Sequence, residues 1–290
     1  MRARFLAKRG WTELHDAPAE IHERDRVLAG FQSAEEVVLW FGHDLSDQLQ
    51  FFQLLDWFAG QDLGTTRLSV ICAAAYLGAL PPEAVRDFFP TRRSVSAREL
   101  ELGREAWDAF RSPDPNRLIA LLKGDTSALA FLEGALARHL EQYPSVRNGL
   151  SRSEAQALKV VVGGEDRLVC VWVASQLDME ERISLDDGSF VEIIRDLCSG
   201  PAPLLELEER PHDPGKPPPS ESARYWRSKV TATATGHEVL EGRRDWIKIR
   251  GIELSRCAAG RDLFASPLGC QGDVCSRRSE VKGVAARVGC

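Results

Sequence analysis

Apolar residues first gather in a continuous run at residues 37–41, which Gly42 closes. Apolarity without alternation is typical of a strand covered on both faces, as in a parallel sheet. Apolar positions then recur every three or four residues over 45–58, which predicts an amphipathic helix. A second buried strand is expected at 67–73. This order predicts a βαβ unit and therefore a partial Rossmann-like α/β domain over residues 1–80, with an incomplete parallel sheet.

From residue 81 onward the pattern of apolar positions turns helical. One helix start is well marked, because Ser96 precedes a periodic run and Glu99 follows three positions later, as in a capping box. Residues 81–148 are therefore expected to form a helical region, with helices at 82–89, 96–110, 116–123 and 127–143.

Residues 149–254 predict a winged-helix-like α+β module. A second capping box begins a helix at Ser151, and an apolar segment at 190–198 predicts another, whereas 168–177 could be helix or strand. Strands are expected at 204–208 and 230–235, on either side of a mobile, proline-rich insert at 210–224. An irregular α+β appendage is the alternative. The tail, 255–290, has no hydrophobic period, contains four of the seven cysteines and is expected to be disordered.

A family resemblance rests on four stretches that occur in this order: LWFGHDLSDQLQFFQLLDWFA, FPTRRSVSARELELGREAWDAFRSPDP, GDTSALAFLEGALARHLEQYPSVRNGLSRSEAQAL and TATGHEVLEGRRDWIKIRGIEL. Together they resemble the bacterial family known as domain of unknown function 1835. The resemblance implies a bacterial protein and no particular activity. Relatives begin with an extra strand that ends in an Asn-Gly-Asp-Ser-like turn, and they continue after Gly251 with a Trp-Leu-Gly-Gly-like segment. A truncated form with an atypical tail is therefore expected, as a late start codon and a shifted reading frame would produce.

Charge argues against nucleic acid as a partner. The chain carries 37 Lys and Arg against 43 Asp and Glu, and its net charge is −6. The helix expected near 187–198 carries Asp187, Glu192 and Asp196 against Arg195 alone, so DNA binding is disfavoured. No apolar run reaches the roughly 18 residues of a membrane span. The start of the chain also lacks the apolar segment of a signal peptide, and we expect a cytoplasmic protein without a membrane partner.

A group of polar residues, His43, Asp44, Asp47 and Gln48, directly follows the first strand. Ligands of open parallel α/β sheets bind beyond the carboxyl ends of the strands. A carboxylate pair beside an imidazole could hold a divalent metal or act as acid and base, which gives His43, Asp44 and Asp47 candidate catalytic roles. Gln48 could orient a phosphate or a ribose hydroxyl. In the alternative, Asp44 or Ser46 caps the helix, Asp47 complements its dipole and His43 covers the strand end.

Two further features of the sequence, an arginine pair and a cysteine, have separate interpretations. Arg92 and Arg93 lie just before the capped helix, an arrangement that favours an anion clamp, with a solvated turn as the alternative. Cys72 lies in apolar surroundings, where a reduced core thiol is the usual explanation.

Two functions stay open on this evidence. The leading hypothesis is a cytoplasmic bacterial protein that binds or hydrolyses a small phosphorylated or nucleotide ligand at the strand end after Phe41. The alternative hypothesis is a noncatalytic regulatory or protein-interaction protein, in which the acidic residues only cap a helix.

Overall fold

The computed structural model describes residues 17–181, 185, 187–208 and 221–251. The chain divides into two compact units, the first ending at Leu140 and the second beginning at Glu141. Each unit has its own cluster of buried hydrophobic side chains. The expected mixed α/β class is confirmed. The expected tail, 255–290, and residues 210–220 of the proline-rich insert lie outside the described residues.

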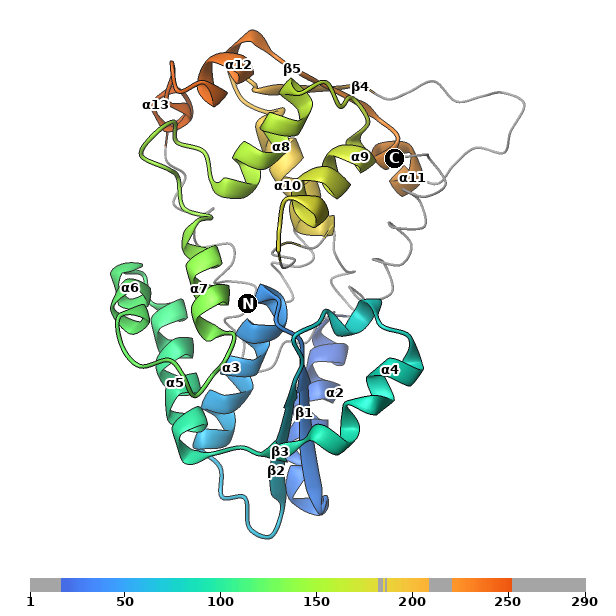
Figure 1. Ribbon diagram of the computed structural model, residues 1–290, viewed down its shortest axis with the longest axis vertical. Helices are drawn as coiled ribbons and strands as arrows, with labels where there is room; N and C mark the ends of the chain where they lie inside the picture. Colours follow the sequence, from blue (N-terminus) through green and yellow to red (C-terminus); the bar gives the residue numbers. More distant parts are fainter. Residues whose placement is uncertain (1–16, 182–184, 186, 209–220, 252–290) are drawn as a thin grey trace, which may run out of the picture. The chain divides into compact units, whose positions relative to one another are not determined.

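The first unit contains a three-stranded sheet in the order β1-β2-β3 (Figure 1). Its strands are β1 (Glu36–Phe41), β2 (Arg67–Cys72) and β3 (Arg93–Ser94). β1 and β2 are parallel, which confirms the expected parallel pair, whereas the antiparallel strand β3 was not expected. The helices of the unit are α2 (Ala17–Ala29), α3 (Leu45–Ala59), α4 (Pro82–Asp87), α5 (Ala97–Arg111), α6 (Asn116–Leu122) and α7 (Leu132–Leu140), with short 3-10 turns at Phe31–Ser33, Leu77–Ala79 and Phe89–Thr91.

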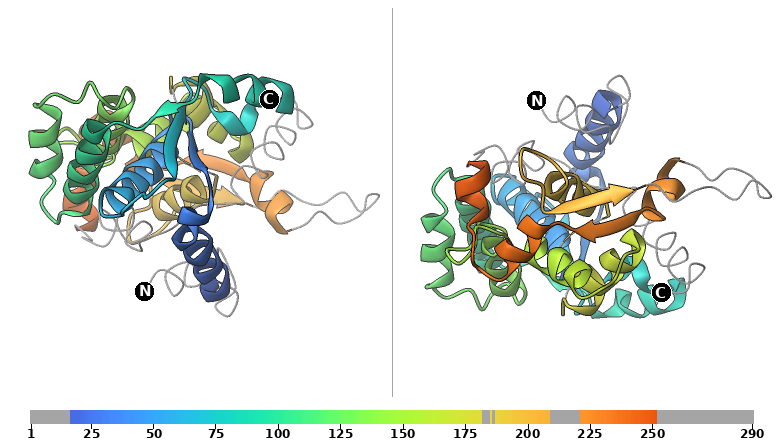
Figure 2. Two further views of the ribbon diagram at one scale, coloured as in Figure 1. Left: turned by 90° about the horizontal axis from the view of Figure 1, so that it is seen from below. Right: turned by 90° about the horizontal axis from the view of Figure 1, so that it is seen from above.

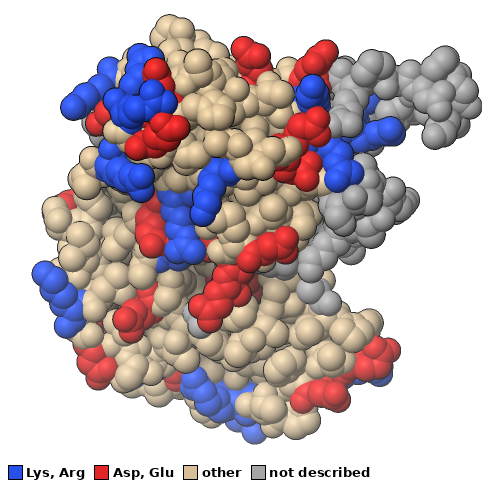
Figure 3. Space-filling view, turned by 45° about the horizontal axis from the view of Figure 1, so that its top comes forward, with Lys and Arg blue, Asp and Glu red and all other residues tan. Residues whose placement is uncertain are grey.

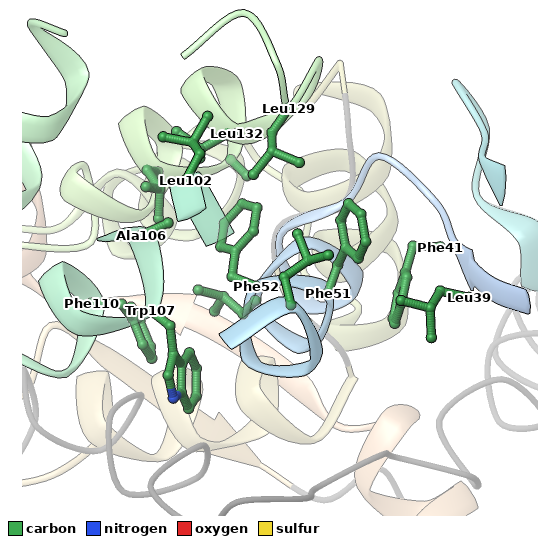
Figure 4. Packing of buried hydrophobic residues seen from close by; sticks show 14 of the residues in the cluster. Leu39, Phe41, Phe51, Phe52, Leu102, Ala106, Trp107, Phe110, Leu129 and Leu132 are labelled. Carbon is green, nitrogen blue, oxygen red and sulfur yellow. The ribbon is translucent and has the colours of Figure 1, made fainter. Parts of the chain in front are cut away.

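Helix α3 lies between the sheet and α5, so it contributes to the core on two sides (Figures 1 and 4). Toward the sheet, the ring of Phe51 stacks on that of Phe41 with centroids 5.1 Å apart. Toward α5, a Cβ atom added at Gly103 would lie 2.7 Å from Cδ1 of Leu55, so only glycine permits this close approach of the helices. Burial on two sides explains why the apolar face of α3 is wide.

The second unit combines helices with a two-stranded antiparallel sheet, whose strands lie side by side in the right view of Figure 2. An isolated antiparallel bridge also joins Arg167 to Lys229. The ambiguous segment 168–177 is helical, and it changes from α-helix to π-helix. The elements are α8 (Arg152–Val162), α9 (Leu168–Trp172), the π-helix Val173–Asp178, α10 (Asp187–Leu197), β4 (Leu205–Glu208), α11 (Glu221–Trp226), β5 (Lys229–Ala232), α12 (Ala234–Leu240) and α13 (Trp246–Arg250).

The largest differences between expected and observed element boundaries occur in three places. The strand expected at 230–235 ends at Ala232, because Thr233 caps α12: its Oγ1 accepts a hydrogen bond from the Gly236 N–H (3.0 Å) and donates one to the Pro203 carbonyl (2.7 Å). The helix expected at 127–143 is confined to α7, and the last residues of the expected insert 210–224 belong to α11. Both predicted capping boxes, at Ser96 and Ser151, are present. Among the described helices, none is both long and apolar enough to cross a membrane.

Candidate functional site

The turn after β1 is held by hydrogen bonds to its two aspartates. The Gly42 N–H donates to Oδ2 of Asp47 at 2.5 Å, and the Asp47 N–H donates to Oδ1 of Asp44 at 3.1 Å. Asp44 has an extended backbone and is the N-cap of α3, with only 4% of its surface exposed. The carboxylates therefore satisfy backbone donors that a strand end and a helix start leave without partners.

Gln48 joins the ends of the two parallel strands. Its Nε2 donates to the Gly42 carbonyl at 2.6 Å and lies 3.4 Å from Sγ of Cys72, a free thiol. The side chain is almost fully buried, and its Oε1 accepts no hydrogen bond from the described residues. Cys72 was not singled out from the sequence as part of a site. The only hint was register, since it ends β2 directly opposite Phe41 at the end of β1.

Gly42 permits the loops after β1 and β2 to meet. A Cβ atom at this position would lie 2.7 Å from the carbonyl oxygen of Ala75, and 3.0 and 3.2 Å from the Oδ2 atoms of Asp47 and Asp44. Its φ is not positive, so the need for glycine here is steric and not conformational. Both carboxylates and the loop after β2 therefore border one small region at the carboxyl edge of the sheet.

Burial controls the protonation of this region. It raises the pKa of Asp47, and the hydrogen bond from the Gly42 N–H opposes part of that shift. Burial also raises the pKa of the Cys72 thiol, which the hydrogen bond from Gln48 only partly opposes. Cys72 is therefore protonated at neutral pH, and it lacks the thiolate character of a nucleophilic cysteine.

His43 packs at the same turn as the aspartates. Its ring is half-buried and meets the ring of Phe131 edge to face, with centroids 5.9 Å apart. Phe131 directly precedes α7, so the imidazole links the strand end to the helical part of the unit. The candidate residues His43, Asp44 and Asp47 thus all belong to the turn after β1. Each makes a contact that stabilises this turn or its packing, which accounts for the residue without a catalytic role.

The two candidate arginines engage different carboxylates. Arg92 lies against Glu36 at the start of β1, with Nε 3.2 Å from Oε2, and its guanidinium covers the Phe89 ring at 4.2 Å. Arg93 lies in β3 and forms two hydrogen bonds with Glu99, at 2.8 and 2.9 Å. Arg92 ends the 3-10 turn before β3 and Arg93 is the first residue of the strand, and each arginine has a separate carboxylate partner. The anion clamp expected from these arginines therefore stays a prediction, and each of them already has a carboxylate partner.

The buried partner of Arg93 also completes the cap of α5. The Glu99 side chain is 3% exposed, and it accepts hydrogen bonds from Ser96 N–H and Oγ as well as from Arg93. Burial alone would raise the pKa of Glu99, but these donors outweigh it and hold the pKa below its usual range. Arg93, itself more than half exposed, therefore pairs with a buried carboxylate.

The fold and the site define a mixed α/β protein with a capped strand-to-helix turn at the carboxyl edge of a parallel strand pair. Within the described ranges, no three or more His, Cys, Asp or Glu side chains come together in a way that could hold a metal ion. Comparisons with protein-family models, curated proteins and solved structures found no match. The resemblance to domain of unknown function 1835 therefore stays a prediction.

Proposed function

We propose that the protein is a noncatalytic regulatory or protein-interaction protein. One observation carries the proposal: the carboxylates of Asp44 and Asp47 accept hydrogen bonds from the backbone of the turn that they occupy. A carboxylate engaged in this way stabilises the turn, and its charge repels a phosphate from the N-terminus of α3. Bringing a phosphorylated ligand to the same edge requires a cation to offset both charges.

The arrangement of the second unit also supports an interaction role. We propose that this unit is winged-helix-like, because α8, α9 and α10 precede β4 and β5, and the Arg167–Lys229 bridge adds one further pairing to the sheet. In the helix that would read DNA, α10, Arg195 is ion-paired with Glu192 at 2.9 Å. Because α10 carries Asp187, Glu192 and Asp196 against Arg195 alone, its net charge is negative and disfavours phosphates, so protein contacts fit this unit better than DNA.

A partial Rossmann-like arrangement is the corresponding proposal for the first unit. It rests on the parallel pair of β1 and β2, connected through α3. In such folds the carboxyl edge of the strands is where ligands bind. A cytoplasmic location is proposed for the whole chain on its sequence alone.

A second candidate function is binding or hydrolysis of a small phosphorylated or nucleotide ligand at the strand edge, with a divalent metal as its cofactor. It is favoured by the buried Oε1 of Gln48, which accepts no hydrogen bond from the described residues. A buried amide oxygen without a donor costs about 1–3 kcal/mol, so a ligand or water donor at this position would be stabilising. His43, Asp44 and Asp47 would be the catalytic residues in this case.

A thermal-shift screen separates the two candidates. Nucleotides and sugar phosphates would be added with and without Mg²⁺ or Mn²⁺ to the wild-type chain, Asp44→Asn and Asp44→Ala. The noncatalytic proposal expects no ligand-dependent shift in any of them. It also expects Asp44→Asn to match the wild type, since asparagine caps helices as well as aspartate does, and Asp44→Ala to lose about 0.5–2 kcal/mol. A metal-dependent shift that Asp44→Asn abolishes would overturn the proposal in favour of the ligand site.

A further inference from the structure

A group of exposed basic side chains gathers at one end of the second unit, where α12 and α13 meet the loop before α8. Arg147 comes from the loop, Arg243 and Arg244 from the α12–α13 turn, and Lys248 from α13; all four are exposed. We call this group the basic patch. Figure 3 shows Lys and Arg side chains on the part of the second unit formed by α12 and α13, at the upper left, with acidic side chains between them.

Buried hydrogen bonds hold the three segments of the basic patch together. The Asn148 carbonyl accepts from the Trp246 N–H at 2.7 Å, and Nδ2 of Asn148 donates to the Val239 carbonyl at 3.0 Å. Gly149 adopts a φ of +77°, and a Cβ there would lie 2.7 Å from the backbone nitrogen of Ile247. The loop is thus fixed against the end of α12 and the start of α13, so the basic residues are presented on a rigid frame.

Arg147 and Lys248 carry positive charges that no acidic side chain of the described residues offsets in a salt bridge. Neither forms a salt bridge with another described residue. Arg147 lies over the turn, since its Nε is 3.5 Å from the position of a Cβ on Gly242. Its side chain therefore packs against the turn that carries Arg243 and Arg244.

The other two arginines have only exposed partners. Arg243 pairs with Glu241, and Arg244 pairs with Glu238 at 3.3 Å, with all four side chains at least 36% exposed. Exposed pairs of this kind contribute about 0–1 kcal/mol and exchange readily with another carboxylate. A partner can therefore engage these arginines at little cost to the stability of the unit.

We propose that the basic patch binds a carboxylate-rich segment of a partner protein. The proposal deepens the interaction function proposed above and names the surface and the chemistry of the partner. Arginine forks bind carboxylates with two parallel hydrogen bonds, which gives specificity as well as affinity. A peptide can space its acidic side chains so that they reach the arginines and avoid Glu238 and Glu241, whereas the regularly spaced phosphates of a nucleic acid backbone would also meet these carboxylates.

The test uses a fluorescently labelled oligoglutamate peptide and a short DNA duplex as probes, with binding followed by anisotropy at low and physiological salt. The patch variant is Arg147→Glu/Arg243→Glu. The control variant is Arg86→Glu/Arg117→Glu in the first unit. The pairs are matched: each contains one exposed arginine paired with a glutamate and one exposed arginine without a salt bridge to a described residue. Both changes alter the net charge equally.

We expect the patch variant to lose roughly tenfold or more in peptide affinity, and the control variant to stay within about twofold. Equal losses in both variants would show binding to overall charge and would overturn the proposal. Absence of peptide binding by the wild type would also overturn it. Tighter, patch-dependent binding of the duplex would replace the peptide with nucleic acid as the partner. The basic patch belongs to the second unit, whereas the ligand screen tests a site in the first unit. A ligand-dependent thermal shift would therefore overturn the noncatalytic function, and a failure to bind peptide would overturn only the role of the basic patch.

Discussion

Replacing Gly42 by alanine tests the close approach of the two loops at the carboxyl edge of the sheet. The new Cβ would lie 2.7 Å from the Ala75 carbonyl oxygen, a backbone atom that cannot move without shifting the loop after β2. Overpacking of this kind costs about 1–3 kcal/mol. Removing a glycine also restricts the unfolded chain and returns about 0.4–1 kcal/mol, so the net loss is smaller than the steric cost alone.

Gly60 offers a matched control at the other end of the same helix. It has a φ of −97°, and a Cβ there would meet only the Trp57 carbonyl oxygen, at an ordinary contact distance of 3.6 Å. The unfolded-state gain is common to Gly42→Ala and Gly60→Ala and cancels between them. The difference in unfolding free energy between the variants is therefore the steric cost, about 1–3 kcal/mol.

Urea unfolding measures this difference directly. With a denaturant slope of about 2 kcal/mol per molar, a difference of about 2 kcal/mol separates the two midpoints by about 1 M. Gly60→Ala should unfold at or above the wild-type midpoint, and Gly42→Ala below it. If the two variants unfold together, the loops after β1 and β2 do not meet as described, and the geometry of the candidate site is wrong.

Three further substitutions have defined outcomes. The pKa of Asp47 lies above its ordinary value of 3.8, so the stability that this carboxyl contributes is complete below that value and is lost as pH rises through the folded-state pKa. The unfolding free energy of the wild type should therefore fall as pH rises above 3.8, and Asp47→Asn should remove this fall. Urea unfolding at a series of pH values measures both, and identical pH profiles for the two proteins would contradict the prediction. Glu99→Gln should cost about 1.5–3 kcal/mol at neutral pH, because charge-assisted hydrogen bonds to a buried carboxylate are lost; wild-type stability would show that they contribute nothing. Leu55→Ala should cost about 2–5 kcal/mol by the same assay, whereas exposed Val27→Ala stays within about 0.5 kcal/mol, and similar values for both would refute the core assignment.

The strand-to-helix turn could be predicted from the sequence because its determinants are local. A run of apolar residues, a glycine and an acidic cap occupy consecutive positions, and each preference favours the same structure. The cap itself, Asp44, was one of the residues named for that role. Local agreement of this kind also made both capping boxes predictable.

Contacts between distant parts of the chain could not be predicted in this way. Gln48 and Cys72 are 24 positions apart, and no spacing pattern shows that they meet. Strand β3 has only two residues, too few for any periodicity, and it exists because the edge of β2 is available for pairing. The pairing places Arg93 in a strand, where the sequence suggested a turn with two arginines facing one anion.

The division into two hydrophobic clusters has a consequence for the order of events during synthesis. The described residues of the first cluster run from Leu28 to Leu140, so all of them are translated before the second unit begins. The cluster of the second unit extends from Leu150 to Trp246. Strand β4 can pair only after β5, which follows it in the chain, has been synthesised. Domains fold as units as they leave the ribosome. The first unit therefore has time to reach its native state alone, whereas the second folds only when nearly all of it has been made.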